Sequence, residues 1–217
     1  MSRADSSTDT AAAAPTAAAT RPRVQGRRED EILDATLALL LEVGYDRLTM
    51  DAVAHRARAS KATLYRRWSA KHTLVMDALL RSKRAPQVTD PDAGNLRDDL
   101  VGTFCGPGGL TQRDNSKLIA VVLTAVHTDD AFAAEFRERF LRPKLEVSRR
   151  IYRRARERGE IAAGVDTDLL GPALAAILLH RVLLLGAPVD RATVEAVVDQ
   201  IIVPAATGRP TSPQGRP

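Results

Sequence analysis

Apolar residues recur at intervals of three and four positions along most of the 217-residue chain. This spacing places them on one face of an α-helix, whereas the sustained two-residue alternation that is typical of half-buried strands is absent from the sequence. The predicted helices are 29–43, 50–58, 61–68, 70–84, 96–104, 116–127, 130–158, 169–185 and 193–202. We therefore expect an all-α fold, in which Pro143 bends or interrupts the longest helix.

Composition divides the chain into two domains with a tail at each end. Residues 1–20 are rich in Ala, Ser and Thr, and we expect them to be disordered, as we expect residues 205–217 to be flexible. The first domain, 21–84, begins with an irregular basic arm and continues with four short helices. Pro, Asp and Gly residues after position 85 mark a boundary, beyond which the second domain runs to residue 204.

The sequence predicts neither a secretory signal nor a membrane span. Residues 1–20 lack the apolar core of a signal peptide. The longest apolar stretch, 169–185, is shorter than the roughly 20 residues that a bilayer requires, and His180 and Arg181 interrupt it. A single cysteine, Cys105, excludes an internal disulfide. We expect a cytoplasmic protein.

Positive charge is concentrated in the first domain. The formal net charge of the chain is +5, and the segment 21–84 holds 14 Lys and Arg residues against 8 Asp and Glu residues. The segment from Ala52 to Met76 contains six of those Lys and Arg residues and no acidic residue. Because neutralised phosphates release condensed counterions, this distribution favours a nucleic acid as partner. A solvated face that only keeps the protein soluble would show the same charge.

Two short helices joined by a tight turn on this basic background predict a helix-turn-helix, whose second helix enters the major groove of DNA. Leu64 and Trp68, four residues apart, would anchor that helix to its neighbours. On its other faces, Lys61 could donate to guanine acceptors and Thr63 could contact a base edge. The small side chain of Ala62 would allow the helix to approach the groove closely. Further side chains suited to the groove or to phosphates are Tyr65, Arg66, Arg67 and Lys71.

Residues 48–54, 57–71 and Leu74 resemble the N-terminal DNA-binding domain of the TetR family of bacterial transcriptional regulators. The resemblance extends over about 28–79 and implies that Lys61 and Thr63 face bases. It implies phosphate contacts for Thr49, Tyr65 and Lys71, and a structural role for Trp68.

The turn departs from the pattern of that family, which often has Ala-Gly-Val where this chain has Ala57-Arg58-Ala59. If the turn requires a positive φ, Arg58 costs about 1 kcal/mol relative to glycine. The basic arm, with Arg21, Arg23, Arg27 and Arg28, is either a minor-groove contact or a solubilising tail. A second basic run, 149–158, is diluted by acids, and we interpret it as a solvated helix face.

The last two predicted helices are apolar on more than one side, which favours a helical-bundle homodimer over a hairpin buried within one subunit. The candidate interface residues are Leu170, Leu174, Ile177, Leu178, Val194, Val197, Val198 and Ile201. The segment 136–143 and this helix pair resemble the C-terminal domain of many TetR family members, which dimerises and often holds a small-molecule effector. Candidate effector-pocket residues are Phe104, His127, Phe132, Phe136, Phe140, Tyr152 and His180, although aromatic residues at helical spacing are core residues more often than ligand contacts.

Together these features predict a homodimeric repressor that binds a pseudo-palindromic double-stranded DNA operator and is released by a small-molecule effector. We expect no cofactor, no metal and no catalytic residues, because the four histidines are scattered without the spacing of metal ligands. The alternatives are a small all-α enzyme and a redox-responsive regulator acting through Cys105.

Overall fold

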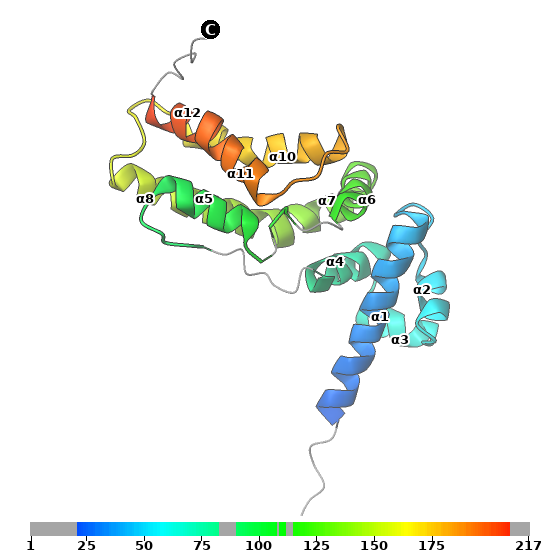
Figure 1. The fold of residues 1–217 in the computed structure, drawn as a ribbon. Coiled ribbons are helices and arrows are strands. Elements are labelled where there is room, and N and C mark those ends of the chain that lie inside the picture. The colour runs from blue at the N-terminus through cyan, green and yellow to red at the C-terminus, as the bar shows by residue number, and fades with distance from the viewer. Residues whose placement is uncertain (1–20, 83–89, 108, 112–114, 209–217) are drawn as a thin grey trace, which may run out of the picture.

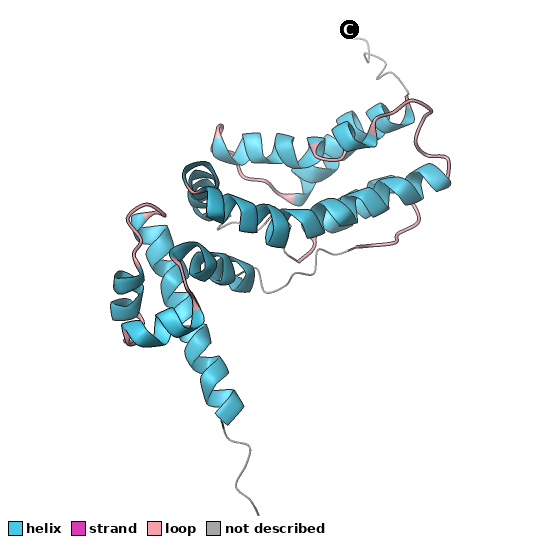
Figure 2. Cartoon of the chain, turned by 180° about the vertical axis from the view of Figure 1, so that it is seen from behind, coloured by secondary structure: helices cyan, strands magenta, loops and turns pink. Residues whose placement is uncertain are grey.

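The computed structural model describes residues 21–82, 90–107, 109–111 and 115–208, so the predicted tail 1–20, residues 209–217 of the other tail and residues 85–89 of the boundary lie outside it. Every regular element within the described ranges is helical, which confirms the all-α prediction (Figures 1 and 2). The elements are α1 (Arg21–Val43), α2 (Met50–Arg56), α3 (Lys61–Arg67), α4 (Lys71–Ser82), α5 (Leu96–Cys105), α6 (Asn115–Thr128), α7 (Asp130–Phe136), η1 (Arg137–Leu141), α8 (Arg142–Glu157), α9 (Thr167–Leu170), α10 (Ala173–Leu183), α11 (Arg191–Val197), η2 (Val198–Ile202) and α12 (Val203–Thr207).

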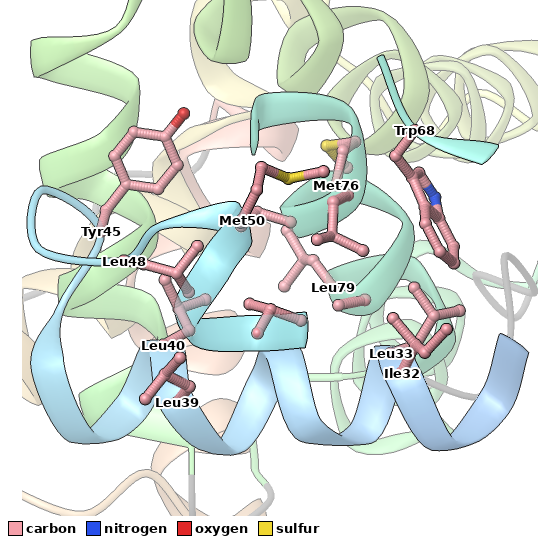
Figure 3. Packing of buried hydrophobic residues seen from close by; sticks show 14 of the residues in the cluster. Ile32, Leu33, Leu39, Leu40, Tyr45, Leu48, Met50, Trp68, Met76 and Leu79 are labelled. Atoms are coloured by element: carbon pink, nitrogen blue, oxygen red, sulfur yellow. The ribbon is translucent and has the colours of Figure 1, made fainter. Parts of the chain in front are cut away.

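Helices α1 to α4 form a small head, and α5 to α12 form a larger body beside it (Figure 1). In the head, apolar side chains from α1, α2, α4 and the segment between α1 and α2 converge on one core, with Leu40, Leu48 and Met76 almost fully buried (Figure 3). The hydroxyls of Thr49 and Ser60 accept hydrogen bonds from backbone N–H groups and cap α2 and α3, as the sequence predicts. Helices as short as these depend on such packing and capping for their stability.

The head is joined to the body by a continuous apolar core. Leu118 and Val122 of α6 and Phe132 of α7 belong to the same buried cluster as the core of the head. The Tyr45 ring lies 5.2 Å from the Phe132 ring, and its hydroxyl donates a 2.5 Å hydrogen bond to Asp129 at the start of α7. A movement of α6 or α7 therefore acts directly on the head.

The basic arm is helical, so the prediction of an irregular arm is wrong. Helix α1 begins at Arg21, and Pro22 lies in its first turn, where its missing N–H would have no intrahelical partner. Arg27 and Arg28 lie 4.0 Å and 2.8 Å from Glu31. Ion pairs between residues three or four positions apart stabilise a helix. The arm therefore projects from the head as a helix (Figure 1).

Both long helices of the body contain a π-helical segment two residues before a proline. The predicted interruption at Pro143 is confirmed as η1, and η2 stands in the same relation to Pro204. A proline has no N–H for the i−4 carbonyl, and a π-helical segment is one way in which a helix accommodates it. The predicted tail starting at 205 is wrong, because α12 extends to Thr207 and Ala206 is fully buried.

The predicted single helix 169–185 is two helices. Asp166 caps α9, which ends at Leu170, and α10 starts after Gly171 and Pro172. Proline lacks the N–H that would continue the ladder, which explains the interruption.

The second basic run is only partly solvated, which corrects the sequence interpretation. Arg150 and Arg154 of α8 both donate 2.8 Å hydrogen bonds to Asp90. Arg154 and Arg158 lie 3.7 Å and 3.6 Å from the fully buried carboxylate of Asp99 on α5. These ion pairs attach the segment before α5 to α8.

Arg58 has a φ of 52°, the one positive value among the described non-glycine residues. The turn therefore requires the positive φ on which the expected cost of Arg58 depends. We expect Arg58→Gly to raise the free energy of unfolding by about 1 kcal/mol, because glycine adopts this conformation without a Cβ clash. Urea unfolding measures the change. Arg58→Ala, which keeps the Cβ and removes the guanidinium, should show no such gain. A lower urea midpoint for Arg58→Gly with an unchanged m-value would contradict this account.

Candidate nucleic-acid interface

Helix α3 presents a basic, solvent-exposed face. Leu64 and Trp68 are buried, which confirms their predicted anchoring role. The remaining surface of the helix carries Lys61, Ala62, Tyr65, Arg66 and Arg67, all exposed, with Thr63 half-buried and its hydroxyl 2.8 Å from that of Ser60. An exposed helix that follows a tight turn has the shape that fits the major groove.

Two cations at the ends of α3 are held by carboxylates from neighbouring helices. Lys61 donates a 2.6 Å hydrogen bond to Asp51 of α2, and Arg67 donates one of 3.0 Å to Glu29 of α1. Hydrogen bonding to these carboxylates raises the pKa of Lys61 and of Arg67. Both side chains are therefore charged and oriented in the free protein.

The predicted arm residue Arg28 contacts the turn of the motif. Its guanidinium donates a 2.5 Å hydrogen bond to the carbonyl of Arg58, the residue with the positive φ. A hollow of about 380 Å³ lies beside this contact between α1 and α3, lined by Gly26, Arg28, Glu29, Ile32, Thr63, Arg66, Arg67 and Trp68. Sequence reasoning missed this positioning role, because the two residues lie 30 positions apart.

Two residues to which the resemblance assigns phosphate contacts also have structural roles. Thr49 caps α2 through its side-chain oxygen. The ammonium of Lys71 donates a 3.1 Å hydrogen bond to the carbonyl of Tyr45 and lies 4.1 Å from the centre of its ring. Thr49 is exposed and Lys71 is half-buried, so Lys71 would have to share its ammonium between Tyr45 and a phosphate.

A polar network connects the end of α3 to the body. The Trp68 indole donates a 2.8 Å hydrogen bond to one oxygen of Asp77 on α4. The other oxygen of Asp77 accepts a 2.6 Å hydrogen bond from Arg139 in η1, and Arg139 also contacts Glu135 at 3.1 Å. No local sequence signal indicates this link, because Asp77 and Arg139 are 62 positions apart.

Asp129 supplies a second link, and it makes the junction sensitive to acid. The hydrogen bond from Tyr45 lowers the pKa of Asp129 below the usual 3.8, so the carboxylate stabilises the fold above that value and less so as the pH falls through the lowered one. We expect unfolding free energy to fall more steeply below about pH 4 in the parent than in Asp129→Asn, whose amide oxygen still accepts hydrogen bonds. Urea unfolding between pH 3 and pH 7 measures this. Asp130→Asn, a change at an exposed neighbour, should behave as the parent does, and identical pH profiles for all three proteins would contradict the prediction.

The structure does not bring the candidate effector-pocket residues to one place. Phe132, Phe136 and Phe140 form a row with ring centres 6.3 Å and 4.9 Å apart at the junction with the head. Phe104 and Tyr152 belong instead to the core of the body. The two remaining candidates, His127 and His180, are exposed on α6 and α10.

Tyr152 is the member of that set with an unusual environment. It is 2% exposed, and its hydroxyl has no hydrogen-bond partner among the described residues. Burial raises the pKa of this hydroxyl, so it remains protonated and can donate. An unpaired buried hydroxyl is energetically costly.

The candidate interface residues fall into two groups. Leu174, Leu178, Val194 and Val198 are fully buried within the protomer, so their assignment to an interface is wrong: they face inward on their helices and pack in the protomer's own core. Leu170 and Ile177 are half-buried, Val197 is 8% exposed and Ile201 is 47% exposed. The most exposed large apolar residues are others, namely Leu169, Leu184 and Leu185.

Cys105 is half-buried at the end of α5. Burial raises the pKa of its thiol, which lowers the fraction of the reactive thiolate and disfavours a redox role. Within the described ranges, no group of three His, Cys, Asp or Glu side chains is arranged to hold a metal ion. None of the helices in those ranges is long and apolar enough to cross a membrane.

An exposed basic helix in a helix-turn-helix head, joined to a separate helical body, defines a class of DNA-binding proteins. Comparison with known families agrees. Residues 32–78 match the family described as "Bacterial regulatory proteins, tetR family", and residues 90–201 match "Tetracyclin repressor-like, C-terminal domain". The chain belongs to the TetR family and is a DNA-binding transcriptional regulator.

Individual relatives agree over most of the chain. An uncharacterized HTH-type transcriptional regulator of Mycobacterium tuberculosis is 39% identical over 87% of this chain and 92% of its own length. A DNA-binding transcriptional repressor TetR of Mycobacteroides abscessus is 34% identical over 81% of this chain and 92% of its own. The crystal structure of a TetR family transcription regulator superposes with a TM-score of 0.60 at 29% identity, covering 81% of this chain and 97% of that one.

Proposed function

We propose that this regulator is a homodimeric repressor of the cytoplasm that binds a pseudo-palindromic operator and leaves it when a small-molecule effector binds the body. The observation that carries the proposal is the exposed basic surface of α3, which presents Lys61, Arg66 and Arg67. The M. abscessus relative, a repressor, supports the direction of regulation.

Exposed apolar surface supports the dimer. Leu184 and Leu185 follow α10 and are 75% and 61% exposed, and Ile201 on η2 is 47% exposed. A hollow of about 450 Å³ lies beside Ile201, lined by Arg181, Asp190, Ala192, Thr193, Ala196, Val197, Gln200 and Ile201. Two protomers related by a twofold axis would cover this face and present two α3 helices to successive half-sites of DNA.

The unpaired hydroxyl of Tyr152 supports an effector site in the core of the body. A ligand with a hydrogen-bonding group would relieve the cost of leaving that hydroxyl buried without a partner. Tyr152 belongs to an apolar core cluster that includes Leu178 and has Phe104 packed against it, which favours a largely apolar effector. The Asp77 and Asp129 contacts would carry its effect from the body to the head.

The proposed DNA contacts divide into base-reading and phosphate-binding residues. Lys61 and Thr63 would reach base edges, and Ala62 would allow their close approach. Phosphate contacts are proposed for Arg27, Arg28, Thr49, Tyr65, Arg66, Arg67 and Lys71. Among the phosphate contacts, Arg66 is exposed and has no ion pair with any described residue, so it offers the cleanest substitution.

Paired substitutions test this division on a duplex that the purified chain enriches from a random pool. Thr63→Ala should weaken binding to that duplex about tenfold and relax the preference at one base position. Arg66→Ala should weaken binding to the enriched and a scrambled duplex by the same factor, and lower the salt slope by about one. Leu41→Ala, at an exposed position on α1, is the control. If neither variant differs from the control, α3 does not contact DNA.

A further inference from the structure

Both ends of α3 carry a cation that the free protein already neutralises. Lys61, the first residue of the helix, lies 2.6 Å from Asp51, and Arg67, the last, lies 3.0 Å from Glu29. The two acids come from different helices, α2 and α1, and their side chains are 56% and 34% exposed. Arg66, by contrast, has no ion pair with any described residue.

These ion pairs lie on the surface that would face DNA. When DNA binds, each cation must therefore either leave its carboxylate for a group of the DNA or contact both. A phosphate that takes Lys61 or Arg67 has to displace a carboxylate, and the displaced carboxylate then lies beside the negative backbone. Each such exchange gains less than the capture of a free cation by the same phosphate. The two acids therefore weaken every phosphate contact that Lys61 or Arg67 makes, whatever the base sequence.

A contact to a base edge does not require Lys61 to leave its carboxylate. The Lys61 ammonium has three donors, so it can keep Asp51 and still donate to the neutral acceptors of a guanine in the major groove. Asp51 also restricts the long Lys61 side chain to one region, which lowers the entropy lost on specific docking. The carboxylate thus penalises phosphate binding and favours a directed base contact.

Resting on the proposed operator binding, we propose that Asp51 is a selectivity residue, which holds Lys61 away from phosphates of random DNA and so widens the gap between specific and non-specific affinity. Asp51 does not need to touch DNA to have this effect. It acts by positioning a base-reading cation, whereas Glu29 holds a phosphate-binding cation and so lowers the affinity for specific and random DNA alike.

Asp51→Asn tests the proposal, with Glu29→Gln and Glu42→Gln as comparison variants. Glu42 forms an ion pair with Arg56 at the junction of α1 and α2, so its replacement removes one negative charge from the same head without releasing a residue of α3. Asp51→Glu restores the charge at the first position. Dissociation constants for the enriched and the scrambled duplex are measured at several salt concentrations for each variant and the parent.

The expected result is that Asp51→Asn and Glu29→Gln bind the scrambled duplex about threefold to tenfold more tightly than the parent at low salt, with a salt slope steeper by about one. For Asp51→Asn, affinity for the enriched duplex rises less than affinity for the scrambled duplex, or falls, so the selectivity ratio drops. Glu29→Gln gains equally on both duplexes, and Glu29→Gln, Glu42→Gln and Asp51→Glu all keep the ratio of the parent. Equal gains of Asp51→Asn on both duplexes, a ratio that drops as far in Glu29→Gln or Glu42→Gln, or no change overturn the proposal.

Failure of the proposed function would look different. A parent chain that binds the enriched and the scrambled duplex equally well would contradict operator recognition itself, before any variant is compared. A selective parent whose ratio is unchanged in Asp51→Asn would leave operator recognition intact and contradict only the role of Asp51.

Discussion

Replacing Phe132 with alanine is expected to lower the free energy of unfolding by about 4 kcal/mol, the cost typical of removing a large aromatic side chain from a core. Phe132 is fully buried in the cluster that the head shares with α6 and α7, and its ring lies 5.2 Å from that of Tyr45. The resulting cavity would lie at the junction between head and body. Calorimetry should show a melting temperature lower by about 12 °C.

A matched control separates this effect from a general loss of apolar surface. Leu41→Ala removes an apolar side chain that is 40% exposed on α1, and we expect a change of no more than about 0.5 kcal/mol. If Phe132→Ala unfolds at the temperature of Leu41→Ala, the head and body do not share the core described here.

Asp99→Ala should cost about 3 kcal/mol of unfolding free energy, because it leaves two guanidinium groups short of a buried partner. The carboxylate of Asp99 is fully buried, accepts a 2.7 Å hydrogen bond from the backbone of Ala93, and lies within 3.7 Å of Arg154 and 3.6 Å of Arg158. Arg154 also contacts Asp90 and Arg158 contacts Glu160, which keeps the cost at the lower end of the range for buried ion pairs.

Two further variants identify which interaction of Asp99 matters. Asp99→Asn keeps an acceptor for the Ala93 backbone but removes the charge, so its stability should lie between those of the parent and Asp99→Ala. Asp168→Ala breaks the exposed pair with Arg149 at 3.5 Å and should change stability by less than about 0.5 kcal/mol. Urea unfolding measures the stability of all three variants. Equal midpoints for Asp99→Ala and Asp168→Ala would contradict a stabilising role for the buried ion pairs of Asp99 with Arg154 and Arg158.

The sequence predicts what local chemistry determines. Helical periodicity predicts the helices, and the hydroxyls of Thr49 and Ser60 mark the starts of α2 and α3. The four-residue spacing of Leu64 and Trp68 predicts the buried side of α3. The interruption at Pro143 follows from the missing N–H of proline, and the departure at Arg58 follows from its place in the turn.

What the sequence does not predict depends on distant partners or on which side of a helix is already covered. Arg28 is 30 positions from Arg58, and Asp77 is 62 positions from Arg139, so no local pattern indicates either contact. Leu174 and Val198 are as apolar as Ile201, yet the protomer's own core covers the first two and leaves the third exposed. The run at 149–158 is basic by composition, but only tertiary packing shows that Arg154 and Arg158 face a buried carboxylate.

The most direct test of operator binding is the salt dependence of the dissociation constant of the purified chain for its enriched duplex and for a scrambled duplex. The account predicts that the enriched duplex binds about a thousandfold or more tightly at moderate salt, and that affinity for both falls steeply between about 50 and 200 mM salt. Equal affinity for the two duplexes, or an affinity that does not change with salt, would contradict it.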